Sequence, residues 1–160
     1  MKHFKTLILF FVLISIVTSC NKDEETTAQG EYLKANIDGV AFSSTFNQVI
    51  FTNSFEPPYK LIDINSNNDN EDYIRITLSS YLEPGTYVLP DEDHPLLSFV
   101  YNSPGITNIW MASTNYQNTT GILTITKETS TQIKGTFSFN AINNDDTIKQ
   151  ITNGEFLVNK

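Results

Sequence analysis

Residues 72–81 read DYIRITLSSY, and this stretch decides the fold class. Ile74, Ile76 and Leu78 fall on one side of an extended chain, and polar side chains fall on the other. Strict alternation of apolar and polar residues is typical of a β-strand with one buried face. The stretch QIKGTFSFNA at residues 132–141 repeats the pattern with phenylalanine on its apolar side. Both stretches predict an all-β protein.

Turn residues on either side of such stretches divide the chain into short strands. Asp38-Gly39 and Asn153-Gly154 each stand between apolar runs, and Asp-Gly and Asn-Gly pairs favour two-residue hairpins. The expected strands are 31–37, 40–43, 48–53, 59–65, 73–81, 86–89, 96–102, 108–114, 121–128 and 132–142, followed by a broken pair at 147–152 and 155–158. Short connections favour antiparallel neighbours, because parallel crossovers need a dozen or more residues. We therefore expect about ten short antiparallel strands in a meander that forms a barrel-like sheet, with a two-sheet β-sandwich as the alternative.

The N-terminus has the composition of an export signal. A basic start is followed by an apolar run of residues 7–17, and two small residues lead to Cys20, the only cysteine. This order is that of a secretory signal peptide, and the run is shorter than the roughly 20 residues of a membrane span. Val17-Thr18-Ser19-Cys20 resembles the lipobox of bacterial lipoproteins. The resemblance implies removal of residues 1–19 and lipidation of Cys20.

The segment behind the cysteine is polar and acidic. Lys22, Asp23 and Glu24 resemble an export signal of surface lipoproteins in one group of Gram-negative bacteria, which implies display on the outside of the outer membrane. Residues 20–30 contain no large apolar side chain and are expected to form a flexible tether. The single all-β domain is then expected over residues 31–160.

Charge and cysteine content exclude several classes of partner and site. Removal of Lys2 and Lys5 with the signal leaves eight basic and eighteen acidic residues, a net charge of −10. Nucleic acid is not expected as a partner, because phosphate binding needs clustered lysine and arginine. With Cys20 alone, the chain has neither an internal disulfide nor a cysteine metal cluster, and no cofactor is expected.

Several motifs of the domain resemble a family of small uncharacterised lipoproteins from the same bacterial group. These motifs are LKANIDGVAFSS at residues 33–44, EPGTYVL at 83–89, GTFSFNA at 135–141 and ITNGEFLV at 151–158. The family is a domain of unknown function, so the resemblance supports the fold and the location. It implies no active site.

One polar segment has the spacing of a calcium loop. Five oxygen-bearing residues alternate along it, namely Asp63, Asn65, Asn67, Asp69 and Glu71. An EF-hand loop has glycine at position 6 and a bidentate glutamate at position 12. Here Asn68 and Ile74 stand at those positions. A polar hairpin tip is the simpler interpretation, and weak calcium binding is the alternative.

His94 is the only histidine after the signal, and three acidic residues directly precede it. Such a set could act in acid–base chemistry at a surface hydrolase. No Gly-x-Ser-x-Gly motif accompanies it, and zinc sites use three or four protein ligands. We therefore expect no catalytic residue, and the hydrolase is kept as the alternative function.

The expected function is that of a non-catalytic outer-membrane lipoprotein, a binding or envelope accessory module anchored by lipid. Its partner is expected to be a glycan or a protein. Aromatic residues that could form a sugar platform are Phe55, Tyr59, Tyr81, Tyr101, Trp110 and Tyr116. Asp146-Thr147-Ile148 resembles an O-glycosylation sequon of exported proteins in the same bacterial group, which makes Thr147 the candidate for modification.

Overall fold

A computed structural model describes residues 30–53, 58–90, 97–104 and 108–160 of the protein. These residues contain eleven strands and no helix, which confirms the all-β prediction. The strands are β1 (Tyr32–Ile37), β2 (Val40–Ser43), β3 (Phe46–Asn53), β4 (Lys60–Asn67), β5 (Tyr73–Tyr81), β6 (Thr86–Leu89), β7 (Leu97–Asn102), β8 (Ile109–Ser113), β9 (Thr120–Glu128), β10 (Gln132–Ile142) and β11 (Ile148–Asn159). No described segment is a helix long and apolar enough to cross a membrane.

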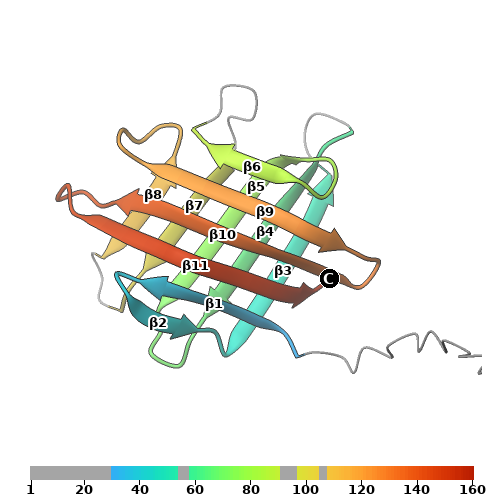
Figure 1. Cartoon of the computed structure of the whole chain (residues 1–160), viewed down its shortest axis with the longest axis horizontal. Coiled ribbons are helices and arrows are strands. Elements are labelled where there is room, and N and C mark those ends of the chain that lie inside the picture. Colours follow the sequence, from blue (N-terminus) through green and yellow to red (C-terminus); the bar gives the residue numbers. More distant parts are fainter. Residues whose placement is uncertain (1–29, 54–57, 91–96, 105–107) are drawn as a thin grey trace, which may run out of the picture.

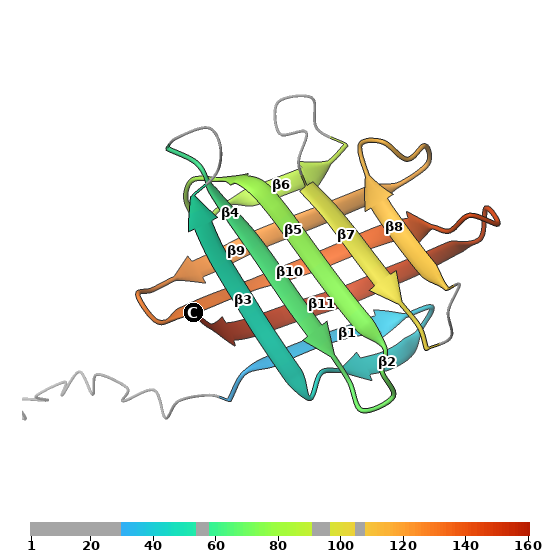
Figure 2. The ribbon, with the colours of Figure 1, turned by 180° about the vertical axis from the view of Figure 1, so that it is seen from behind.

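All strand pairs are antiparallel, and the strands form one sheet in the order β2-β1-β11-β10-β8-β7-β5-β4-β3. Strand β9 pairs with β10, and β6 pairs with β9. Strand β10 contacts β8 through one residue pair, Ile142 and Met111, and there the sheet turns over on itself. The result is a half-barrel, which confirms the barrel-like prediction. Its two halves are the β10 layer (β1, β2, β6, β9, β10 and β11), in front in Figure 1, and the β5 layer (β3, β4, β5, β7 and β8), in front in Figure 2.

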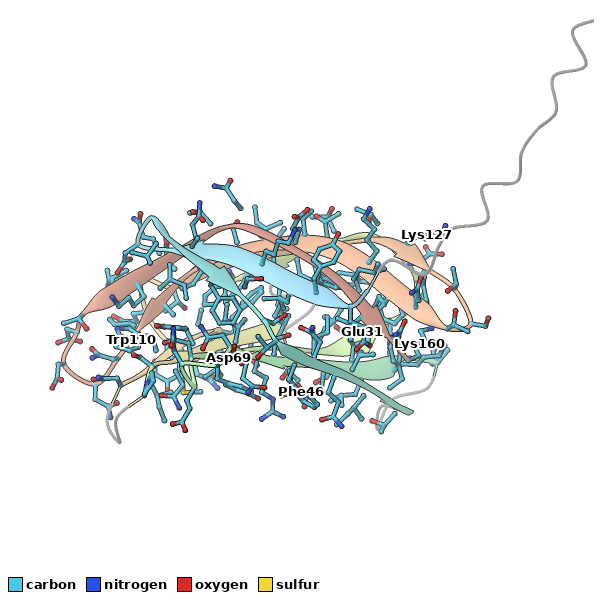
Figure 3. The ribbon with its side chains drawn as sticks, turned by 90° about the horizontal axis from the view of Figure 1, so that it is seen from below. Glu31, Phe46, Asp69, Trp110, Lys127 and Lys160 are labelled. Atoms are coloured by element: carbon cyan, nitrogen blue, oxygen red, sulfur yellow. The ribbon has the colours of Figure 1, made fainter. Side chains whose placement is uncertain are left out.

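The space between the layers is filled with apolar side chains, as Figure 3 shows from below. Ile74, Ile76 and Leu78 of β5 are fully buried there, so the alternation predicted for this stretch is confirmed. Phe99 of the β5 layer and Phe139 of the β10 layer stack with ring centroids 4.7 Å apart. Aromatic contact across the layers therefore holds the two halves of the sheet together.

The hairpin predicted at Asp38-Gly39 is confirmed. Both residues have positive φ, 49° and 84°, as a type I′ turn requires. The Asp38 carboxylate also accepts hydrogen bonds from the Gln150 backbone N–H at 2.9 Å and from Lys149 Nζ at 2.6 Å. The turn between β1 and β2 is thereby tied to β11.

The hairpin predicted at Asn153-Gly154 is wrong, because β11 runs through both residues without a break. In the β10–β11 register Phe137 lies opposite Gly154 while Phe139 lies opposite Ile151, so β11 contains one extra residue. Asn153 has φ of 52°, and a Cβ on Gly154 would lie 2.5 Å from the Phe137 carbonyl oxygen. Both features describe a β-bulge. Asn-Gly supplies positive φ equally well to a turn or to a bulge, so the pair alone does not distinguish them.

Candidate functional site

The outer face of the β5 layer presents a line of hydroxyl groups across three strands. Thr77 of β5 lies opposite Ser98 of β7, and Ser98 lies opposite Ser113 of β8. We call these three residues the hydroxyl row. All three are half-buried, although they face away from the core. Directly opposed residues on neighbouring strands have Cβ atoms about 4.5–5.5 Å apart.

A second line of side chains lies two residues away from the hydroxyl row on β7 and β8, and it continues onto β10 and β11. Val100 lies opposite Met111, Met111 opposite Ile142, and Ile142 opposite Ile148. We call these four residues the apolar row, and Ile148 at its end is 52% exposed. Because alternate residues of a strand are about 6.6 Å apart, the two rows run side by side on β7 and β8. On β5 the position opposite Val100 is Arg75, so the apolar row does not extend onto that strand.

A shallow groove of about 560 Å³ lies over the hydroxyl row. Its described lining comprises the row itself, Ser79, Leu97, Met111 and residues 114–116 of the β8–β9 loop. None of these side chains is charged, whereas the whole chain has a net charge of −8. The described lining of the groove is thus uncharged, on a protein that is acidic as a whole.

The β8–β9 loop is fixed against the groove by its own hydrogen bonds. The Thr119 hydroxyl, 5% exposed, donates to the carbonyls of Ser113 and Tyr116 at 3.1 and 2.9 Å. The Tyr116 backbone N–H donates to the Ser113 carbonyl at 3.0 Å, and the Tyr116 hydroxyl contacts Met111 Sδ at 3.4 Å. The Tyr116 side chain, 38% exposed, is therefore held in place beside the groove.

An ion pair between a buried carboxylate and an exposed arginine adjoins the hydroxyl row. Arg75 donates to Asp63 through Nε at 2.9 Å and through Nη2 at 2.5 Å, and the Thr77 hydroxyl lies 3.4 Å from the same carboxylate. Asp63 is only 6% exposed although it lies on the outer face. The hydrogen bond to Asp63 also raises the pKa of Arg75. The carboxylate is therefore engaged by its neighbours.

The structure does not gather the five calcium candidates around one point. Asp63, Asn65 and Asn67 belong to β4, where alternate residues are about 6.6 Å apart. Asp69 and Glu71 lie in the turn between β4 and β5. Among the described residues, no group of three or more histidine, cysteine or acidic side chains could hold a metal ion.

A second cluster joins the two layers at the end of β11. Glu128 of β9 accepts hydrogen bonds from the Tyr81 hydroxyl and from Lys160 Nζ, and Lys160 Nζ lies 4.4 Å from the centre of the Phe51 ring. Burial raises the pKa of Glu128, but the hydrogen bonds from Lys160 and Tyr81 outweigh it, and the net pKa is lowered. Burial, reinforced by Glu128, raises the pKa of Tyr81. Because these groups satisfy one another, the cluster is a structural link between the layers.

The aromatic platform expected for sugars does not form as one surface. Tyr81, Tyr101 and Trp110 are buried between the layers, at 0%, 6% and 7% exposure. Tyr59 is half-buried before β4, and Phe55 lies outside the described residues. Of this set, Tyr116 is the one that lines the groove.

Of the remaining candidates, the structure describes Thr147 and leaves the other five outside the described residues. Thr147 is exposed in the turn before β11, and its hydroxyl accepts a hydrogen bond from Trp110 Nε1 at 3.1 Å. Cys20, Lys22, Asp23, Glu24 and His94 lie outside the described residues. The roles assigned to these six residues stay predictions.

The hydroxyl row was not found from the sequence. In the sequence, its three residues are ordinary solvent-facing positions of three separate strands. To find the row, one would have to know which strands are neighbours in the sheet. A simple meander would put β6 beside β5. In the structure β6 crosses to β9 instead, and β7 takes the place next to β5.

Comparison with known proteins identifies one family. The family model for the domain of unknown function DUF6252 matches residues 29–158. No curated protein and no solved structure gives a significant match. The match confirms the expected relation to an uncharacterised domain family over nearly the whole domain. The chain therefore belongs to the DUF6252 family.

Proposed function

We propose that this protein is a non-catalytic binding module of the bacterial outer membrane. In this proposal it is anchored by lipid on Cys20, directed outward by Lys22, Asp23 and Glu24, and binds its partner in the groove of the β5 layer. The lipobox-like sequence and the acidic tether support the anchor. A protein tethered in this way needs a binding surface that the membrane leaves accessible.

One observation carries the proposal, namely the separation between the tether and the groove. The chain enters the domain at Glu31, whose carboxylate accepts a hydrogen bond from the Asn159 backbone N–H at 2.7 Å. In Figure 2 the described chain enters β1 at the lower left, whereas β7 and β8, two strands of the groove, lie at the right. A membrane anchor at that corner would leave the side of β7 and β8 away from the membrane.

The chemistry of the groove supports a binding role in preference to hydrolysis. A serine or threonine nucleophile needs an adjacent base. The described hydroxyls of the row lie beside one another, and the neighbouring Asp63 carboxylate is engaged by Arg75. No observation in the described residues favours the alternative hydrolase at His94.

Protease treatment of intact cells, combined with detergent partition, tests the proposal. We expect the wild type to partition into detergent and to be digested on intact cells. Cys20→Ala should leave the detergent phase, because it has no acyl chain to insert. Replacement of Lys22, Asp23 and Glu24 by alanine should keep the protein in the detergent phase but protect it from the protease.

A matched control separates the export signal from the general charge of the tether. Asp23→Ala is compared with Glu25→Ala just beyond the signal, and each variant removes one negative charge. The second variant should be digested like the wild type. The surface address is wrong if the triple variant is digested as readily as the wild type, and the anchor is wrong if Cys20→Ala still partitions into detergent.

A further inference from the structure

We propose that the groove of the β5 layer binds a neutral saccharide that lies across β5, β7 and β8. This inference rests on the proposed function, because it names the ligand class of the same groove. The three strands face the viewer side by side in Figure 2. Two features of the surface carry the inference, the pairing of a hydroxyl row with an apolar row and the absence of charge from the described lining.

The two rows match the two kinds of surface that a sugar presents. Each hydroxyl of Thr77, Ser98 and Ser113 both donates and accepts, as sugar hydroxyls do. Neighbouring strands are about 4.8 Å apart, so the row offers hydrogen bonds at regular intervals along a chain of sugar rings. Met111 and Tyr116 provide an apolar surface and an aromatic edge for the carbon faces of the rings.

The charge distribution selects against ionic ligands. The chain has a net charge of −8, so an anionic ligand is repelled. A cationic ligand finds no charged side chain in the described lining, and the adjacent Asp63 is engaged by Arg75. A neutral polyol is not repelled by the net charge and does not need a charged side chain to bind it.

The geometry also favours a saccharide over a peptide. An extended peptide gains most of its affinity by adding a strand to a free sheet edge. Strands β5 and β7 are paired on both sides, and β8 is paired with β7 and, at Met111, with β10, so the groove lies mainly on a face of the sheet. Because this face is shallow and open to water, we expect a dissociation constant of about 1 mM.

Titration calorimetry with the mature lipidated protein, which begins at Cys20 in this proposal, tests the inference. The protein is kept in a zwitterionic detergent, because glycoside detergents would occupy a sugar site. The probes are four neutral hexasaccharides, namely α-1,4-linked, β-1,4-linked and β-1,3-linked glucose and β-1,4-linked xylose. A hexagalacturonate is the anionic control, and an uncharged decapeptide is the peptide control. Met111 is the only methionine besides Met1, so its oxidation by hydrogen peroxide, measured by mass spectrometry, reports whether the groove is covered.

We expect at least one neutral hexasaccharide to bind and to slow the oxidation of Met111. Tyr116→Ala should weaken that binding by about tenfold, and Ser98→Ala by about threefold. Ser138→Ala is the matched control, because Ser138 is also a half-buried serine on an outer face, that of β10. It should bind like the wild type.

Three results would overturn the inference. One is the failure of all four neutral probes to bind at about 10 mM, tenfold above the expected dissociation constant. Another is binding that neither groove variant weakens. The third is binding of hexagalacturonate or of the decapeptide alone. Each leaves the display of the domain untouched, since that is measured by protease treatment of cells, so the two proposals fail separately.

Discussion

Substitution of Gly121 by alanine should destabilise the protein, because the opposite layer of the sheet lies directly against this residue. Gly121 belongs to β9, and the Phe99 ring of β7 rests on it from across the core. A Cβ at position 121 would lie 2.3 Å from Cε2 and 2.9 Å from Cδ2 of Phe99. The ring cannot easily retreat, since it is fully buried and stacked on Phe139 at 4.7 Å.

The expected magnitude is the difference between two effects. Alanine is favoured over glycine within a strand by about 0.5–1 kcal/mol. Overpacking of a filled core costs about 1–3 kcal/mol, and a contact of 2.3 Å belongs at the upper end. We therefore expect Gly121→Ala to lower the free energy of unfolding by about 2 kcal/mol, which corresponds to about 8 °C in Tm for a domain of this size.

Urea denaturation of Gly121→Ala, followed by far-UV circular dichroism, measures this loss. The matched control is Gly85→Ala, because the nearest atom to a Cβ there is the Glu83 carbonyl oxygen at 3.9 Å. That variant should be as stable as the wild type or slightly more stable. The double variant Phe99→Leu/Gly121→Ala should lose less free energy of unfolding than the sum of the losses of the two single variants, because the smaller side chain at position 99 leaves room for the Cβ at position 121. Equal midpoints for Gly121→Ala and Gly85→Ala would refute the packing of the two layers described here.

Three further predictions concern the ion pair, the cluster at the end of β11 and the turn before β11. Arg75→Ala should cost about 1 kcal/mol in urea denaturation, because Asp63 loses its partner but the exposed arginine is screened by water. The net-lowered pKa of Glu128 contributes stability that is present above the unfolded pKa of about 4.3 and is lost as the pH falls through the folded value. The urea concentration at the unfolding midpoint should therefore decrease as the pH is lowered below about 4.3. Tyr81→Phe should make this decrease smaller, because it removes one of the hydrogen bonds to Glu128. The alternatives for Thr147 are an O-linked glycan and an unmodified threonine. Hexose additions in the intact mass of the native protein that Thr147→Ala removes would show the glycan, and an unmodified wild-type mass would exclude it.

The fold class could be predicted because the physical signal is local. Alternation at Ile74, Ile76 and Leu78 depends only on the two-residue period of a strand, and the structure buries all three. The Asp38-Gly39 hairpin was likewise predictable, since the turn needs positive φ at both residues. The break expected at Asn153-Gly154 failed because β10 and β1 are present on both sides of β11 and keep it paired through the bulge.

The groove could not be predicted because it depends on which strands become neighbours. Thr77, Ser98 and Ser113 are far apart in the sequence, and only the pairing of β5 with β7 and of β7 with β8 brings them together. The polar segment from Asp63 to Glu71 is interpreted first as a hairpin tip. The structure places its first part in β4 and Asp69 and Glu71 in the turn before β5.

The most direct test of the central claim, that a lipid anchor displays the groove on the cell surface, is labelling with a membrane-impermeant maleimide. Cys20 is the only cysteine, so the wild type should not react even after lysis, because its sulfur is occupied by lipid. Ser98→Cys puts one thiol in the groove, and the account predicts that it is labelled on intact cells. Labelling of this variant only after lysis would contradict the display, and labelling of the lysed wild type would contradict the anchor.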